Sequence, residues 1–395
     1  MKSIQSFLGE LIRTPSQVAV DDLGRIVKTV RDHLDGQHIH YALVGAERKP
    51  SAIVINPPTH ETDQVLVLDA CLDTAPVGDL SQWQVSPFAA TVNDGWLYGR
   101  GSADSKAAVA IFSELAKSER LTSKGKHRGR FRRVTVVFDC DEHSGKFGGI
   151  KAYTRKYGFP EFCAIGYPGI DAIVSGSRGF FRTVVTLRGH MGHAGSGKIP
   201  RELAINKLNH LLSELEEINQ MAQVSSEEFP LGPRASATWI RTGVRSFSVT
   251  PSKIECGIDI RLTPSFDPNA ASALLDRILK SIAASGGDEH PSTVSVPNCW
   301  PAYKTPDAAL LPSLLLASAS RLLDKPPKLT ISGPSNIGNY LAMHGTEVLS
   351  GFGVDYENIH GPDERVRLSS VSDVYAIYAD TTRNFLSGAG QNNDA

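Results

Sequence analysis

Several side chains that can bind a metal or move a proton occur where apolar strands of the sequence give way to polar loops. The apolar segment QVLVLDAC leads into such a loop, and the run RRVTVVF leads into the acidic segment DCDEHSG. The residues at these and similar exits are Cys71, Asp73, Asp104, Glu142, His143, Tyr167 and His360. Carboxylates, imidazoles and thiolates are the ligands that transition metals prefer in proteins, so these residue types predict a metal centre.

The segments that carry these residues alternate between strand and helix. Strand patterns cover 51–57, 64–71 and 161–169, the segment 132–145 is a strand that runs into an acidic loop, and a helix pattern covers 104–118. This alternation predicts an α/β fold with a mixed, mainly parallel sheet flanked by helices. In such a sheet the strand exits meet in one crevice, which would bring the polar residues together.

The pattern changes near Ser177 to the order strand, helix, strand, strand, helix, strand, which is typical of a two-layer α+β module. The segments concerned are 178–195, 200–219, 236–250, 252–264, 268–285 and 292–296. The chain then returns to helix patterns at 307–323 and 369–387 and a strand pattern at 346–353. We therefore predict a discontinuous catalytic domain of residues 1–177 and 297–395, with an inserted domain of residues 178–296.

Composition narrows the classes of protein that fit. The 395 residues carry a net charge of −1, which gives no electrostatic basis for a nucleic-acid or membrane partner. The basic stretch 123–133 is predicted to be a solvated loop. Residues 1–16 have the apolar spacing of an amphipathic helix and not that of a signal peptide. Five cysteines without a CxxC pair indicate a reduced, cytoplasmic protein.

The order of motifs along the chain resembles the zinc aminoacylase/carboxypeptidase family of metallopeptidases. That family includes glutamate carboxypeptidase, acetylornithine deacetylase and succinyl-diaminopimelate desuccinylase. The resemblance covers nearly the whole chain and rests on CLDTAPVGDLSQWQVSPFAATVNDGWLYGRGSADSK, DEHSGKFGG, GHMGHAGSG, DIRLTP, GPSNIGNYLA and HGPDERV.

The resemblance implies a metal centre whose usual ligands are partly replaced. The family generally holds two zinc ions with five side chains, and Asp104 matches the aspartate that bridges them. His143 and His360 match the remaining ligands of one ion, and Cys71 and Tyr167 match those of the other. Three of the five ligand types therefore differ from the family's. We expect one zinc ion rather than two, with another divalent transition metal as an alternative.

The resemblance also implies catalytic roles. Glu142 matches the general base, and Asp73 matches a carboxylate that orients a histidine which is replaced here by Cys71. His193 matches a histidine that stabilises the oxyanion, and Arg261 matches an arginine that binds the substrate carboxylate. The other pocket residues are Ser248, Gly333 and Ser335. The inserted domain would serve as a lid and join a second subunit in a homodimer.

Several alternatives remain open from the sequence. Cys71 is a metal ligand, a buried packing residue or a nucleophile, and Tyr167 is a ligand or a packing and hydrogen-bonding residue. The leading hypothesis is a metal-dependent hydrolase that cleaves the amide of an N-acyl amino acid or small peptide carrying a carboxylate. One rival is a rebuilt, metal-free site for acyl transfer, amide formation or a lyase reaction. The other rival is a dimeric binding protein without activity.

Overall fold

The protein consists of two compact units. The computed structural model describes residues 2–46, 49–197, 202–221, 225–243, 245–286 and 289–388. Unit 1 comprises Met1–Gly176, Lys304–Thr330 and Asn336–Ala395, and unit 2 comprises Ser177–Tyr303 and Ile331–Ser335. Among the described residues, no helix has both the length and the apolar character needed to cross a bilayer.

Unit 1 is built on a seven-stranded mixed sheet with the order β1-β2-β7-β3-β8-β16, and β6 pairs with β7. Its strands are β1 (Tyr41–Ala46), β2 (Lys49–Ile55), β3 (Gln64–Cys71), β6 (Thr122–His127), β7 (Arg130–Asp139), β8 (Phe162–Ile165) and β16 (Glu347–Leu349). The central strands β7, β3, β8 and β16 are parallel, and β1, β2 and β6 are antiparallel to their neighbours. The predicted α/β class with a mixed sheet is confirmed.

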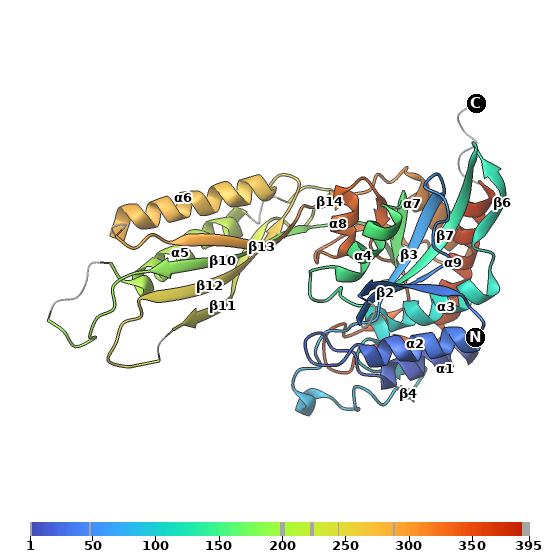
Figure 1. Ribbon diagram of the computed structural model, residues 1–395, viewed down its shortest axis with the longest axis horizontal. Helices are drawn as coiled ribbons and strands as arrows, with labels where there is room; N and C mark the ends of the chain where they lie inside the picture. Colours follow the sequence, from blue (N-terminus) through green and yellow to red (C-terminus); the bar gives the residue numbers. More distant parts are fainter. Residues whose placement is uncertain are drawn as a thin grey trace. The chain divides into compact units, whose positions relative to one another are not determined.

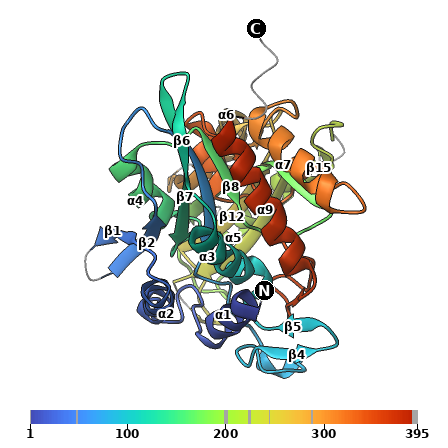
Figure 2. The same ribbon diagram turned by 90° about the vertical axis from the view of Figure 1, so that its right-hand side faces the viewer.

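Helices cover the sheet of unit 1, with α4 on one side and α3 and α9 on the other (Figure 2). The helices are α1 (Lys2–Arg13), α2 (Gly24–Gly36), α3 (Ala107–Ser118), α4 (Gly148–Tyr157), α7 (Leu310–Leu322), α8 (Ile337–Met343) and α9 (Ser370–Ser387). Strand β3 is buried from Val65 to Cys71, as expected for a strand with both faces covered. The apolar run Val65–Leu68 therefore follows from the central position of the strand, although the strand also buries Asp69.

Short strands and helical turns complete the connections of the chain. They are η1 (Leu80–Gln82), η2 (Ser102–Lys106), β4 (Thr91–Asn93), β5 (Trp96–Tyr98), β9 (Ala172–Ser177), β14 (Tyr303–Lys304), β15 (Lys328–Ser332), β17 (Tyr356–Glu357) and β18 (Arg365–Arg367). Strands β17, β18, β5 and β4 form one sheet in that order. This small sheet joins the segments before Asp104 and after His360 through the pairing of β5 with β18.

Unit 2 is a four-stranded antiparallel sheet with two long helices (Figure 1). The elements are β10 (Gly179–Arg188), α5 (Ala204–Met221), β11 (Arg234–Thr242), β12 (Lys253–Leu262), α6 (Pro268–Gly286) and β13 (Thr293–Trp300), and the strand order is β11-β12-β10-β13. Its own core includes Val185, Leu211, Ile258 and Ile278. By contacts, residues 297–303 and 331–335 group with unit 2 and not with the predicted catalytic domain, since β13 continues along β10 to Trp300.

Several local predictions differ from the structure; the strand expected over 236–250, for example, ends at Thr242. The helix expected over 104–118 begins at Ala107, because Asp104 and Ser105 have non-helical dihedral angles. The basic stretch 123–133 is not a loop but most of a hairpin, in which β6 pairs with β7. Its turn residues Arg128 and Gly129 both have positive φ, of 49° and 81°, as the preferred two-residue hairpin turns require. The prediction of helix at 200 and 201 lies outside the described residues.

Candidate active site

The buried carboxylate of Asp104 is the centre of the polar cluster in unit 1. His360 Nε2 lies 2.9 Å from Asp104 Oδ2, and His143 Nε2 lies 3.5 Å from the same oxygen. The donor atoms of these three residues all lie within 4.8 Å of one another. Burial acts to raise the pKa of Asp104, but His143 and His360 outweigh it and hold the pKa below its ordinary value. Asp104 is therefore an anion between two imidazoles.

A buried ion pair fixes the backbone on both sides of this centre. Arg100 and Glu364 pair at 2.5 Å with side chains 1% and 0% exposed. Glu364 Oε1 accepts the backbone N–H of Ala103 at 2.9 Å and that of Asp104 at 3.3 Å. Arg100 donates to the backbone carbonyl of His360 at 2.9 Å. The pair thus holds two segments that are more than 250 residues apart in sequence, and our sequence analysis did not identify it.

Asp73 positions the Glu142–His143 segment. Its oxygens accept the backbone N–H of Glu142 at 3.1 Å and that of His143 at 2.8 Å. The same carboxylate lies 3.4 Å from the ring Nδ1 of His143. The imidazole that Asp73 faces is therefore that of His143, whereas position 71 offers a thiol without a ring N–H.

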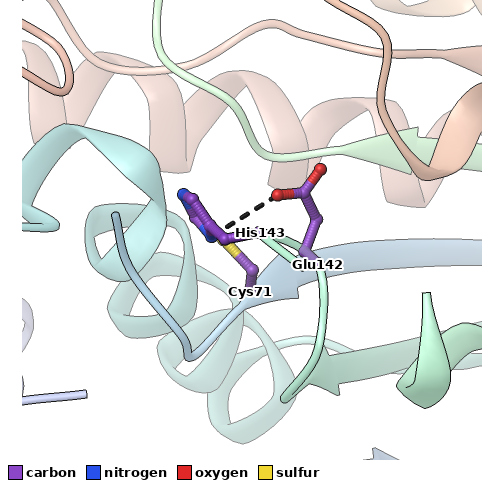
Figure 3. A group of neighbouring side chains, drawn as sticks. All are labelled: Cys71, Glu142 and His143. Carbon is purple, nitrogen blue, oxygen red and sulfur yellow. Dashed lines mark ion pairs between the residues drawn. The ribbon is translucent and has the colours of Figure 1, made fainter. Parts of the chain in front are cut away.

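The pKa values of Glu142, Cys71 and Tyr167 are shifted by burial and by nearby negative charges; Figure 3 shows Glu142 and Cys71 beside His143. Burial raises the pKa of Glu142 to about 7, and Asp104 and Asp73 act in the same direction. Burial, followed by the charge of Asp104, raises the pKa of the Cys71 thiol well above its ordinary value. Burial and Glu142 do the same to Tyr167. Glu142 can therefore exchange a proton near neutral pH, whereas Cys71 and Tyr167 remain protonated.

Cys71 is packed into the site from the end of β3. Its backbone N–H donates to Ser105 Oγ at 2.9 Å, and its sulfur lies 3.2 Å from that oxygen and 3.5 Å from Asp104 Oδ1. The sulfur also lies within 4.8 Å of donor atoms of Glu142 and His143. A nucleophilic role requires a thiolate, which burial and the neighbouring carboxylates disfavour. The surroundings favour packing or neutral hydrogen bonding.

The donors of Asp104, His143 and His360 fit a single divalent transition metal. One carboxylate and two imidazoles are a common three-ligand set for catalytic zinc, with a fourth position left for water. Both ring nitrogens of His143 are buried; Nδ1 lies 3.4 Å from Asp73 and Nε2 lies 3.5 Å from Asp104. With a carboxylate beside Nδ1, Nε2 is the nitrogen placed to bind a cation next to Asp104. To bind a second ion, Cys71 and Tyr167 would have to lose their protons to it, and burial of both groups opposes that loss.

The remaining predicted site residues lie in unit 2. His193 follows β10 and forms a bridge with Val249, and the N–H of Ala194 donates to the Ser248 carbonyl at 2.8 Å. The structure thus brings His193 and Ser248 into neighbouring backbone segments.

Arg261 belongs to a group of arginines that our sequence analysis did not recognise. Its Nε lies 2.7 Å from Asp259 Oδ1, and it pairs across the sheet with Arg234. Burial lowers the pKa of Arg178, and the positive charges of Arg261 and Arg234 lower it further. Unit 2 therefore presents a concentration of cationic charge where the sequence indicated a single arginine. The sequence did not indicate that Arg178, Arg234 and Arg261 lie near one another, because they are far apart along the chain.

Arg178 also contacts the two pocket residues predicted in the GPSNIG motif. Its Nε donates to the Gly333 carbonyl at 3.1 Å, and its own carbonyl accepts from Ser335 Oγ at 2.5 Å. A Cβ at position 333 would come within 3.4 Å of the Arg178 side chain and 3.1 Å of Leu231. Gly333 and Ser335 thus shape the surroundings of Arg178.

Comparison with known proteins places the whole arrangement in one family. Residues 67–384 match Peptidase family M20/M25/M40. The chain belongs to this family. The match spans every element of unit 1 that carries the Asp104 cluster, and it also spans unit 2. It confirms the resemblance to the zinc aminoacylase/carboxypeptidase family and the expectation of an enzyme of the hydrolase class.

Relatives of the M20 chain include two bacterial enzymes. Succinyl-diaminopimelate desuccinylase 2 of Shewanella loihica is 27% identical over 327 residues, which are 79% of this chain and 83% of that protein. The succinyl-diaminopimelate desuccinylase of Sulfurimonas denitrificans is also 27% identical, over 78% of this chain and 80% of that protein.

Solved structures share the fold at lower identity. An M20 family metallo-carboxypeptidase from Sulfolobus solfataricus superposes with a TM-score of 0.75 at 16% identity, over 98% of this chain and 100% of that one. A dinuclear metal-binding peptidase of Bacillus subtilis gives a TM-score of 0.66 at 15% identity, over 98% of this chain and 99% of that one. These matches confirm the fold class.

Proposed function

We propose that this M20 chain is a metal-dependent hydrolase that cleaves the amide bond of an N-acyl amino acid or small peptide carrying a carboxylate. The observation that carries the proposal is the position of Glu142, a carboxyl that is 11% exposed and has its pKa raised to about 7, beside the donors Asp104, His143 and His360. A divalent metal on those donors would polarise the amide carbonyl and make water more acidic. The named activity of the desuccinylase relatives is of this type.

The chain's own residues supply the proton transfers and the orientation. Glu142 accepts a proton from the attacking water and returns it to the leaving amine, for which a pKa near the working pH is favourable. Asp73 fixes both the Glu142–His143 backbone and the His143 ring. His193 donates a hydrogen bond to the carbonyl oxygen as negative charge develops on it.

The arginines of unit 2 support recognition of an anionic substrate. A guanidinium can bind a carboxylate through two parallel hydrogen bonds. Arg261, Arg178 and Arg234 place three such groups near one another. We assign Ser248, Gly333 and Ser335 to the walls of the same binding region.

The edge strand β11 exposes Trp239 and Ile240, at 45% and 49%, which supports the proposal that unit 2 joins a second copy in a homodimer.

A panel of paired substrates tests this function. N-succinyl and N-acetyl amino acids and dipeptides are compared with the same compounds in which the carboxylate is converted to a carboxamide. We expect hydrolysis of at least one carboxylate compound, with kcat/KM lower by about 10-fold or more for its carboxamide, since a hydrogen bond to a charged group contributes about 1.5–3 kcal/mol. Equal rates for both members of each pair, or no hydrolysis of any compound with zinc present, would contradict the proposal.

Metal analysis tests the composition of the centre in unit 1. We expect His360→Ala and Asp104→Asn each to remove one equivalent of bound metal from the full chain, because both residues supply donors to the same ion. We expect Cys71→Ala to remove none, since its sulfur already contacts Ser105 Oγ and Asp104 Oδ1. Metal is measured by elemental analysis after exhaustive dialysis. A loss of metal in Cys71→Ala equal to that in His360→Ala would show that the thiol is a ligand after all.

A further inference from the structure

A second group of potential metal ligands lies within unit 2, apart from every residue assigned above. It consists of His190, which follows β10, Glu202, which precedes α5, and His290, which precedes β13. One donor atom from each of the three residues lies within 4.8 Å of the other two. Three segments distant in sequence thus direct two imidazoles and a carboxylate to one place.

The distance between the imidazoles matches that in a zinc site. His190 Nδ1 and His290 Nε2 are 3.4 Å apart. Two nitrogens bound tetrahedrally at about 2.0–2.1 Å from zinc are separated by about 3.3–3.4 Å. Glu202 is 4% exposed, and within the described residues its Oε2 is buried and accepts no hydrogen bond. A buried carboxylate oxygen without a partner requires a cation or a proton.

Neighbouring groups hold His190 in the orientation that metal binding needs. Its other ring nitrogen, Nε2, lies 2.9 Å from Glu289 Oε2, so a carboxylate can accept the Nε2 proton and leave Nδ1 as the donor to a metal. The backbone N–H of His190 donates to the Glu202 carbonyl at 2.8 Å. At Gly189 a Cβ would lie 2.5 Å from the Ala204 nitrogen, so this close approach of two backbones requires glycine.

The local charge also favours a cation. Lys207 forms a buried ion pair with Glu202 Oε1 and donates to the His290 carbonyl at 2.9 Å. This pairing occupies Oε1 of Glu202 and leaves Oε2 to bind a cation. Glu289 adds a second negative charge beside His190, so the cluster and its neighbours include two carboxylates and one ammonium group. His190 is 41% exposed, which leaves a path for an ion from solvent.

We propose that unit 2 binds one divalent transition metal of the zinc type through His190, His290 and Glu202, separately from the Asp104 centre. The ion would tie the segments before α5 and before β13 to residue 190. His193 lies three residues further along and is held on its other side by the pairing with Val249. The ion would therefore fix the start of the segment that carries His193, which makes His190 a positioning residue.

Metal titration of the full chain tests this site directly. Protein stripped with a chelator is titrated with Zn²⁺, and bound metal is counted by elemental analysis for wild type, His190→Asn, His290→Asn and the matched control His210→Asn. His210 is a partly exposed histidine of the same unit that contacts Ser281, Ser285 and Glu214. We expect both cluster variants to bind one equivalent fewer than wild type and the control to bind the same number.

The two centres can be told apart in the same experiment. His360→Ala removes an ion from unit 1, so His190→Asn in that background should remove a further equivalent, whether or not the Asp104 centre is catalytic. Glu289→Gln should weaken binding at this site by about 10–100-fold, as loss of a partner to a ligating histidine does. If His190→Asn and His290→Asn retain the wild-type number of ions, the two rings form only a histidine–histidine hydrogen bond and the proposal is wrong.

Discussion

Replacement of Glu142 by glutamine should lower kcat by about 10²–10⁴-fold or more on whichever compound of the panel is hydrolysed. Glutamine keeps the size of the side chain but cannot accept the proton of the attacking water. The carboxyl is suited to this task because burial, with Asp104 and Asp73, raises its pKa to about 7. The measurement is steady-state kinetics with metal content determined on the same samples.

Asp141→Asn is the matched control for this experiment. Asp141 is the neighbouring acid, and its carboxylate accepts the backbone N–H of Gly148 at 3.1 Å, an interaction that an asparagine oxygen can keep. We expect its kcat to stay within about threefold of wild type and the metal content of both variants to be unchanged. If Glu142→Gln kept the wild-type rate, another group would have to move the proton, and the rebuilt-site alternative would gain support.

Replacement of Arg100 by methionine should destabilise unit 1 by about 3–5 kcal/mol. The change leaves Glu364, which is 0% exposed, buried without its cationic partner. Burial already raises the pKa of Glu364 against the opposing effect of Arg100. For a domain of this size the loss corresponds to a fall of roughly 6 °C or more in Tm, which calorimetric scanning measures.

The surface pair Arg383–Glu119 provides the control. Arg383 is 55% exposed, so Arg383→Met removes an ion pair from solvent and should cost about 1 kcal/mol or less. The double variant Arg100→Met with Glu364→Gln should recover part of the loss, because glutamine removes the buried charge while its oxygen still accepts from Ala103. Equal falls in Tm for Arg100→Met and Arg383→Met would show that the buried pair does not hold the site together.

The prediction for Arg100 also bears on the metal centre. The pair holds the backbone of Asp104 through Glu364 and that of His360 through Arg100. Loss of such outer contacts generally costs 10–100-fold in metal affinity. The milder variant Arg100→Lys keeps the charge but not the geometry of a guanidinium. We therefore expect it to fold stably but to bind less metal.

The sequence by itself determined the elements whose pattern of apolar and polar residues reflects their burial in the fold. The apolar run from Val65 to Leu68 marked β3, because a strand covered on both faces is mostly apolar. The two-layer order of unit 2 and the mixed sheet of unit 1 followed from the changing hydrophobic period. The motifs around Asp104, Glu142 and His360 indicated the family, since their order along the chain is a property of the sequence alone.

The tertiary structure decided which residues meet. Helix α3 begins after Ser105 because the backbone at Asp104 and Ser105 leaves the helical region, a local conformation that helix periodicity does not report. The pairing of Arg100 with Glu364 and the meeting of His190 with His290 join positions that are far apart in the chain. Asp73 faces His143 for the same reason. Such contacts arise from packing of distant segments, so neither composition nor spacing contains them.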